Sequence, residues 1–146
     1  MADLSVNIAG VNFNNPIIAA SGTFGFGHEY KEFYPLNTLG GISCKGITLE
    51  ERQGNPPPRI AETPGGMLNA VGLQNPGVDY FIENDLPWLK KQGTVIIANI
   101  AGNTPEDYCM MAEKLSDTDV DMIEMNISCP NVRQGGVQFG TSCAGV

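Results

Sequence analysis

The chain has 146 residues, with 16 acidic side chains against 8 basic ones and a net charge of -8 at pH 7. Proteins that bind nucleic acids neutralise phosphates with clustered Lys and Arg, so this charge balance argues against nucleic acid as a partner. Apolar residues make up 42% of the sequence and charged residues only 16%, against about 25% in an average soluble domain, which predicts a well-buried globular fold.

Neither a membrane span nor a secretion signal is expected, so we predict a cytoplasmic protein with no membrane partner. The longest apolar stretch, residues 95–101, is interrupted by Asn99 and is far shorter than the roughly 20 residues of a membrane helix. The N-terminus has no basic segment followed by an apolar run. The cysteines are Cys44, Cys109, Cys129 and Cys143. Their irregular spacing, with a single histidine, predicts free thiols and no metal site.

The first predicted element is a β-hairpin, in which residues 4–8 and 11–13 flank Ala9-Gly10. After the hairpin, short apolar runs alternate with longer amphipathic ones, which indicates βα units and a parallel sheet. The predicted strands of this sheet are residues 16–20, 41–45, 94–100 and 121–127. The third strand is apolar on both faces, as in a parallel strand that is covered on each side.

Helices are predicted between these strands. A glycine-rich turn and a short helix near residues 28–34 should follow the first strand, and a helix over about residues 78–91 should precede the third, with a break or restart near Pro87. The next helix should begin at Thr104, whose hydroxyl can cap it. The apolar stripe of this last helix is Tyr108, Met111, Ala112 and Leu115. We expect Cys109 near this apolar side and Cys44 on the second strand, both in the core.

The interval between the second and third strands is about twice as long as the others. It should therefore contain one βα unit and an insertion at about residues 46–77. This insertion includes three consecutive prolines at residues 56–58 and the pair Gly65-Gly66. Long ordered loops of this kind are usually functional, so we expect the insertion to contribute to a site.

Ligands of parallel α/β folds bind at the carboxyl ends of the strands. The residues at these positions are small or polar, and they are Ser21-Gly22, Lys45-Gly46, Asn99 and residues 126–131. Such residues suit a neutral or anionic planar ligand that forms many hydrogen bonds. Lys45 beside a glycine fits an anion site, and Asn99 ends an apolar run, so its amide needs partners if it is buried.

Four motifs occur in order along the chain. They are Ala20-Ser21-Gly22-Thr23, Lys45-Gly46-Ile47-Thr48, the seven residues from Asn69 to Asn75, and the segment from Asn126 to Asn131 that contains Cys129-Pro130. Together they resemble the dihydroorotate dehydrogenases of class 1, from about residue 4 to the last residue. The glycines of residues 22–27 and the segments 132–136 and 139–140 resemble the NAD-linked type B more than the fumarate-using type A.

This resemblance implies an α/β fold that is the N-terminal half of a (β/α)8 TIM barrel with an N-terminal β-hairpin. Residues 1–146 would form a single unit, a partial FMN-binding barrel of about four strands. A complete barrel typically has about 250 residues. We therefore expect the chain to be a fragment that is inactive alone and needs a complementary C-terminal half.

The resemblance also implies a reaction, the oxidation of dihydroorotate to orotate in pyrimidine (UMP) biosynthesis. Cys129 would act as the base and FMN as the hydride acceptor. The residues implied to contact FMN are Ser21, Lys45, Gly46, Asn99 and Asn126, and a flavin edge would supply the partners of the Asn99 amide. The residues implied to contact the substrate are Lys45, Asn69, Ala70, Val71, Gly72, Leu73, Asn126 and Asn131.

Type B enzymes pair this FMN subunit with a separate subunit that carries FAD and an iron–sulfur cluster and passes electrons to NAD. A homodimer or a heterotetramer is therefore expected for the complete protein. An alternative is a flavoenzyme similar to tRNA-dihydrouridine synthases, whose active-site loop also has an Asn-x-x-Cys-Pro pattern. Such an enzyme must bind RNA, and the acidic charge balance and the motif at residues 69–73 both argue against it.

Overall fold

The computed structural model describes residues 2–128, 140, 141 and 143 of the chain. The strands are β1 (Val6–Ile8), β2 (Val11–Phe13), β3 (Ile18–Ala19), β4 (Gly41–Ser43), β5 (Ile60–Thr63), β6 (Gly66–Asn69), β7 (Val95–Ile100) and β8 (Met122–Met125). The α-helices are α1 (Val78–Tyr80), α2 (Leu86–Lys90) and α3 (Pro105–Ser116). A π-helical segment, Phe81–Asp85, joins α1 to α2, and Tyr30–Glu32 and Leu36–Thr38 are 3-10 turns.

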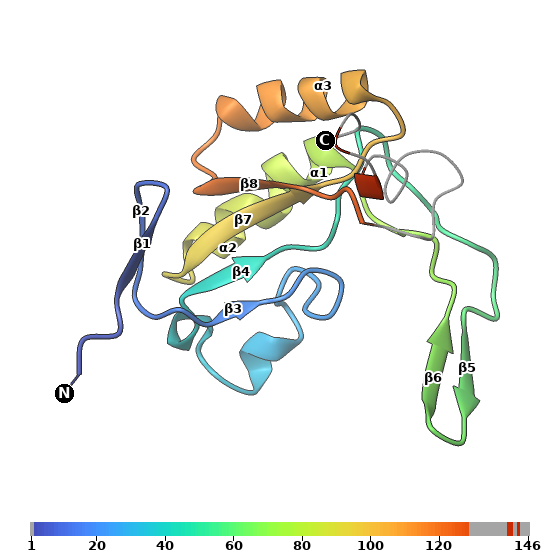
Figure 1. Cartoon of the computed structure of the whole chain (residues 1–146), viewed down its shortest axis with the longest axis horizontal. Coiled ribbons are helices and arrows are strands. Elements are labelled where there is room, and N and C mark those ends of the chain that lie inside the picture. The colour runs from blue at the N-terminus through green and yellow to red at the C-terminus, as the bar shows by residue number, and fades with distance from the viewer. Residues whose placement is uncertain (1, 129–139, 142, 144–146) are drawn as a thin grey trace.

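The centre of the fold is a parallel sheet in the order β3-β4-β7-β8 (Figure 1). All three pairings in it are parallel, which confirms the predicted arrangement of βα units. The strands are shorter than predicted, and β3 has only two residues. Ile42, Ile96 and Ala98 point from the sheet into a core that α2 and α3 cover with apolar side chains. The most deeply buried of these helix side chains are Leu86, Leu89, Met111 and Leu115.

Among the described residues, a hairpin covers the opposite face of the sheet at its amino end. The predicted hairpin is present as β1 and β2, and both residues of its turn, Ala9 and Gly10, have the positive φ angles that tight hairpin turns require. Phe13 of β2 packs on Val95 and Ile97 of β7 and is 1% exposed. The hairpin therefore forms an apolar layer on the amino half of this face, and the part of the chain that the structure describes leaves the carboxyl half open.

Helix α3 begins as predicted, but one expected core residue lies outside the core. The Thr104 side chain accepts a hydrogen bond from the Asp107 backbone N–H, and the Asp107 carboxylate accepts one from the Thr104 N–H. Cys109, which we expected near the apolar side, is exposed. This prediction was wrong because Cys109 lies about 100° around the helix axis from the buried Tyr108. Cys44, by contrast, is buried as predicted.

The insertion between β4 and α1 contains a hairpin that the sequence pattern did not reveal. Strands β5 and β6 pair antiparallel and project from the body of the molecule (Figure 1). The segment near residues 28–34, expected to be a helix, forms only the 3-10 turn Tyr30–Glu32. Pro87 lies in the first turn of α2, directly after the π-helical segment, so the helical run continues through it. In the described part of the chain, no helix is long and apolar enough to cross a membrane.

Candidate active site

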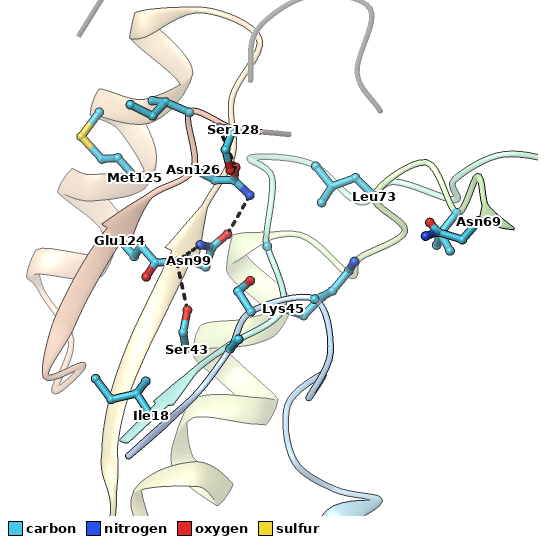
Figure 2. Close-up of a pocket in the computed structure, with 16 residues that line it drawn as sticks. Ile18, Ser43, Lys45, Asn69, Leu73, Asn99, Glu124, Met125, Asn126 and Ser128 are labelled. Carbon is cyan, nitrogen blue, oxygen red and sulfur yellow. Dashed lines mark hydrogen bonds between the residues drawn. The ribbon is translucent and has the colours of Figure 1, made fainter. Parts of the chain in front are cut away.

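A cavity of about 770 Å³ lies at the carboxyl ends of β3, β4, β7 and β8 (Figure 2). This is the edge of the sheet where ligands of parallel α/β folds bind. Its lining residues are Ile18, Ala20, Ser21, Gly22, Ser43, Lys45, Gly46, Asn69, Val71, Leu73, Asn99, Glu124, Met125, Asn126, Ile127 and Ser128. The cavity thus combines the four strand ends with the segment that follows β6.

The structure brings most of the predicted site residues together. All five residues predicted to contact a cofactor line the cavity, and they are Ser21, Lys45, Gly46, Asn99 and Asn126. Of the residues predicted to contact only the substrate, Asn69, Val71 and Leu73 also line it. Cys129 and Asn131 lie outside the described residues, and Ser128, which precedes Cys129 in the sequence, is part of the lining.

Two predicted substrate residues, Ala70 and Gly72, are not among the cavity-lining residues. Asn69, Val71 and Leu73 line the cavity, whereas Gly72 and the Ala70 carbonyl lie against Asn55. The Asn55 Nδ2 donates to the Ala70 carbonyl at 2.8 Å. A Cβ at Gly72 would lie 2.8 Å from Asn55 atoms, and Gly72 has a φ of +76° that favours glycine.

Lys45 brings a positive charge into the cavity. The described residues form ion pairs at His28, Lys90 and Lys114, and none of these pairs includes Lys45. In Figure 2 the half-buried Lys45 side chain extends toward the side where Leu73 and Asn69 lie. Its ammonium group is therefore available to an anionic ligand at that side of the cavity.

Hydrogen bonds attach the glycine-rich turn to the end of β4. The Ser21 Oγ donates to the Cys44 carbonyl at 2.7 Å, and the Lys45 backbone N–H donates to the Gly25 carbonyl at 2.9 Å. These bonds join two segments that are 23 residues apart at Ser21 and Cys44. These hydrogen bonds within the protein therefore fix the position of the cavity wall near Lys45.

Asn99 is 2% exposed, and its amide partners come from the protein. Its Nδ2 donates to the Glu124 carboxylate, and its Oδ1 accepts from Asn126 Nδ2 at 3.2 Å. We had expected a ligand edge to supply these partners. The structure shows that side chains on β8 and on the segment after it supply one partner to each end of the amide, which leaves one N–H and one lone pair for a ligand.

The sequence interpretation missed two polar residues of the cavity, Ser43 and Glu124. Side chains two positions apart on a strand point to the same face. Ser43 is two residues before Lys45, and Glu124 is two residues before Asn126. This spacing was a usable signal, since the predicted site residues already defined the cavity face of both strands.

Gly46 presents bare backbone in the wall of the cavity and is packed closely against its neighbours. A Cβ at this position would lie 3.0 Å from Asn99 Oδ1 and 3.2 Å from Leu73 Cδ1, both tighter than ordinary contacts. The amides of Asn99 and Asn126 lie on one side of Gly46 and the apolar Leu73 on the other. This combination of a bare backbone, amides and one cation can accommodate a flat polar ring that approaches the backbone closely.

Cys44 lies between the cavity-lining residues Ser43 and Lys45, but its thiol belongs to the core. Burial, and after it the nearby Asp85 carboxylate, raise the pKa of Cys44 from 9.0 to about 12. A thiol with this pKa remains protonated at neutral pH and is a poor base or nucleophile. Cys44 is therefore not a candidate for acid–base chemistry at the site.

The fold matches that of a known class of enzymes. A solved structure of dihydroorotate dehydrogenase from Eimeria tenella, in complex with ferulenol, aligns with a TM-score of 0.67 and 26% sequence identity. The alignment covers 90% of this chain and 38% of that one. This match confirms the predicted α/β fold, the N-terminal half of a TIM barrel.

The chain belongs to the dihydroorotate dehydrogenase family, whose sequence model matches residues 3–144. Relatives named dihydroorotate dehydrogenase B (NAD(+)), catalytic subunit, confirm the predicted similarity to type B. The protein from Petrotoga mobilis is 62% identical over 141 residues, which are 97% of this chain and 47% of that protein. The protein from Phocaeicola vulgatus is 56% identical over 146 residues, 99% of this chain and 48% of that protein. The chain spans about half the length of the curated relatives it matches.

Proposed function

We propose that this chain is the substrate-facing half of an NAD-linked dihydroorotate dehydrogenase, which oxidises dihydroorotate to orotate in pyrimidine (UMP) biosynthesis. The observation that carries this proposal is the single cavity that gathers Lys45, Asn99 and Asn126 with Asn69 from a distant hairpin. Relatives that are 62% identical and named for this activity support it. Residues 1–146 act as one unit in this proposal.

FMN is the cofactor that the family implies, and the described residues fit it. Ser21, Lys45, Gly46, Asn99 and Asn126 would hold the flavin ring, because Gly46 presents bare backbone beside the two amides. When bound, FMN accepts the hydride that leaves C6 of dihydroorotate. The protein keeps the amide pair of Asn99 and Asn126 in one orientation, which prepares their remaining hydrogen-bonding capacity for a ring edge.

The substrate would occupy the side of the cavity nearest to β6. The Lys45 ammonium group would bind its carboxylate, and Asn69, with Asn126 and Asn131, would hold its ring by amide hydrogen bonds. Val71 and Leu73, with backbone groups of Ala70 and Gly72, would enclose the carboxylate end. Cys129, which follows Ser128 in the sequence, would remove the proton from C5. The chain thus supplies both the charge that binds the substrate and the base.

The proposed enzyme includes further parts. Strands β3 and β8 are the edges of the open sheet, and large apolar side chains are exposed on both, with Ile18 at 36% and Met125 at 59%. We propose that a complementary C-terminal half of the barrel covers these edges and that this chain alone is inactive. The whole assembly is named the complete barrel below. A separate subunit with FAD and an iron–sulfur cluster would pass electrons to NAD, in a cytoplasmic homodimer or heterotetramer.

The test is flavin reduction in the complete barrel loaded with FMN. Addition of dihydroorotate without oxygen should bleach the visible flavin absorption band. Cys129→Ala should slow this bleaching by at least 100-fold, about the contribution of one general base, with FMN retained. Cys109→Ala is the matched control, since Cys109 is exposed on α3, and it should bleach at the unmodified rate. Absence of bleaching in the unmodified protein would refute the activity, and normal bleaching in Cys129→Ala would refute the base.

A further inference from the structure

A continuous set of hydrogen bonds crosses the cavity wall, and in it Glu124 joins Ser43 to Asn99 (Figure 2). The Glu124 Oε1 on β8 accepts from Ser43 Oγ on β4 at 3.0 Å and from Asn99 Nδ2 on β7. The Asn99 Oδ1 accepts from Asn126 Nδ2 at 3.2 Å, and the Asn126 Oδ1 accepts from the Ser128 backbone N–H at 3.2 Å. These five residues, the Glu124 network, link three adjacent strands to the residue that precedes Cys129.

The chemistry of the carboxylate gives the network a direction. An ionised carboxylate only accepts hydrogen bonds, whereas each amide has a donor side and an acceptor side. Because Glu124 accepts, Asn99 must turn its NH2 group toward Glu124 and its oxygen toward Asn126. Asn126 must then turn its own NH2 group toward Asn99 and its oxygen toward Ser128. One carboxylate therefore sets the orientation of two amides in succession.

Hydrogen bonds fix the backbone of Asn126, so only the orientation of its side-chain amide can vary. Its N–H donates to the Ile100 carbonyl at 2.8 Å, and its carbonyl accepts from the Tyr108 hydroxyl at 2.7 Å. With the main chain fixed on both sides, a rotated amide would place two donors or two acceptors face to face at Asn99. It would also remove the oxygen that the Ser128 N–H contacts.

We propose that Glu124 is a positioning residue, which fixes the amides of Asn99 and Asn126 and through them the start of the segment that carries Cys129. This inference rests on the proposed function, since the segment matters for the rate only if Cys129 is the base. Its role is that of an acceptor with the correct reach to Ser43 and Asn99.

Three variants of the complete barrel distinguish the reach of the Glu124 side chain from its negative charge. Glu124→Gln removes the charge and keeps an acceptor oxygen at the same reach, whereas Glu124→Asp keeps the charge and is one methylene group shorter. We expect Glu124→Asp to slow flavin reduction by dihydroorotate more than Glu124→Gln does. Glu124→Met, which has no acceptor, should lower kcat by about 100-fold, as expected for a base displaced by about 1 Å, with a smaller change in KM. Glu113→Gln, on the exposed side of α3, is the control and should be unaffected.

A second measurement does not depend on catalysis. The 15N-labelled side-chain NH2 signals of Asn99 and Asn126 should move or broaden in Glu124→Asp and Glu124→Met, and less in Glu124→Gln. If Glu124→Met does not fold, the Gln and Asp variants alone decide. Equal rates in all variants, a slower rate for Gln than for Asp, or unchanged NH2 signals would overturn the inference. If only the proposed function is wrong, the unmodified barrel will not be reduced, while the NH2 signals still respond to Glu124.

Discussion

The buried thiol of Cys44 makes the stability of the protein depend on alkaline pH. Cys44 is 1% exposed, and burial, assisted by Asp85, raises its pKa from 9.0 to about 12. In the unfolded chain the thiol loses its proton near pH 9, whereas the folded chain retains it to about pH 12. The unfolded state therefore binds fewer protons in this interval, and the free energy of unfolding falls as the pH rises.

The size of this effect follows from the shift. Each pH unit above 9 lowers the free energy of unfolding by about 1.4 kcal/mol, for a total of about 4 kcal/mol by pH 12. Cys44→Ala lacks this buried thiol, so its free energy of unfolding lacks this dependence on pH. At about pH 8 the variant should be less stable by roughly 1 kcal/mol, because a small buried group has been removed. The free energies of unfolding of the unmodified protein and of Cys44→Ala, plotted against pH, should therefore cross at about pH 10.

The assay is urea unfolding of both proteins between about pH 8 and pH 11. The difference between them cancels the titration of tyrosines, lysines and the other cysteines. Alkylation at about pH 8 provides an independent measurement, since the exposed Cys109 should react while Cys44 stays protected. A difference in stability that stays constant across this pH range would refute the reasoning, as would rapid alkylation of Cys44 in the folded protein.

Two further predictions concern the cavity wall and a helix end. Gly46→Ala should weaken FMN binding by the complete barrel about tenfold, or about 1.4 kcal/mol, because the methyl group would lie 3.0 Å from Asn99 Oδ1. Flavin fluorescence titration measures this, with Gly65→Ala as the control, since a Cβ there meets no atom within 4 Å. Thr104→Ala should lower the free energy of unfolding by about 1 kcal/mol, because the Asp107 N–H loses its cap, and an unchanged urea midpoint would contradict this.

Parts of the fold were predictable because they depend on local chemistry and on burial. The strand β7 is an apolar run buried at every position, and α3 begins at a capping residue followed by proline. The hairpin β5–β6 was not predictable, since all of its residues are exposed and no alternation of apolar and polar residues marks it. Hydrophobic patterning reports which face of an element is buried, so it carries little information about a hairpin that buries neither face.

The candidate site was partly predictable for a similar reason. Polar residues at strand ends, such as Lys45 and Asn99, stand out against the apolar runs that precede them. Glu124 lies inside a predicted strand, where an acidic residue is usually read as part of a solvated face. Its role depends on register, because the pairing of Asn99 with Glu124 places both side chains on the cavity face. The register of neighbouring strands is set by contacts between distant segments and is not visible in one strand alone.

On the face of the sheet that lines the cavity, an apolar layer lies next to the polar Glu124 network and helps it to hold its geometry. Phe13 of the hairpin seals the lower layer, and its ring would lie 2.8 Å from a Cβ at Gly41, so the lack of a side chain there lets the hairpin approach β4 closely. Ile97 and Met122 extend this apolar floor directly below Asn99 and Glu124 on the same strands. Within the network, Ser43 and Asn99 are 3% and 2% exposed, whereas Glu124 is exposed. An unpaired polar group at the two buried positions is costly. The floor formed by β1 and β2 therefore favours the fully paired arrangement of the amides above it.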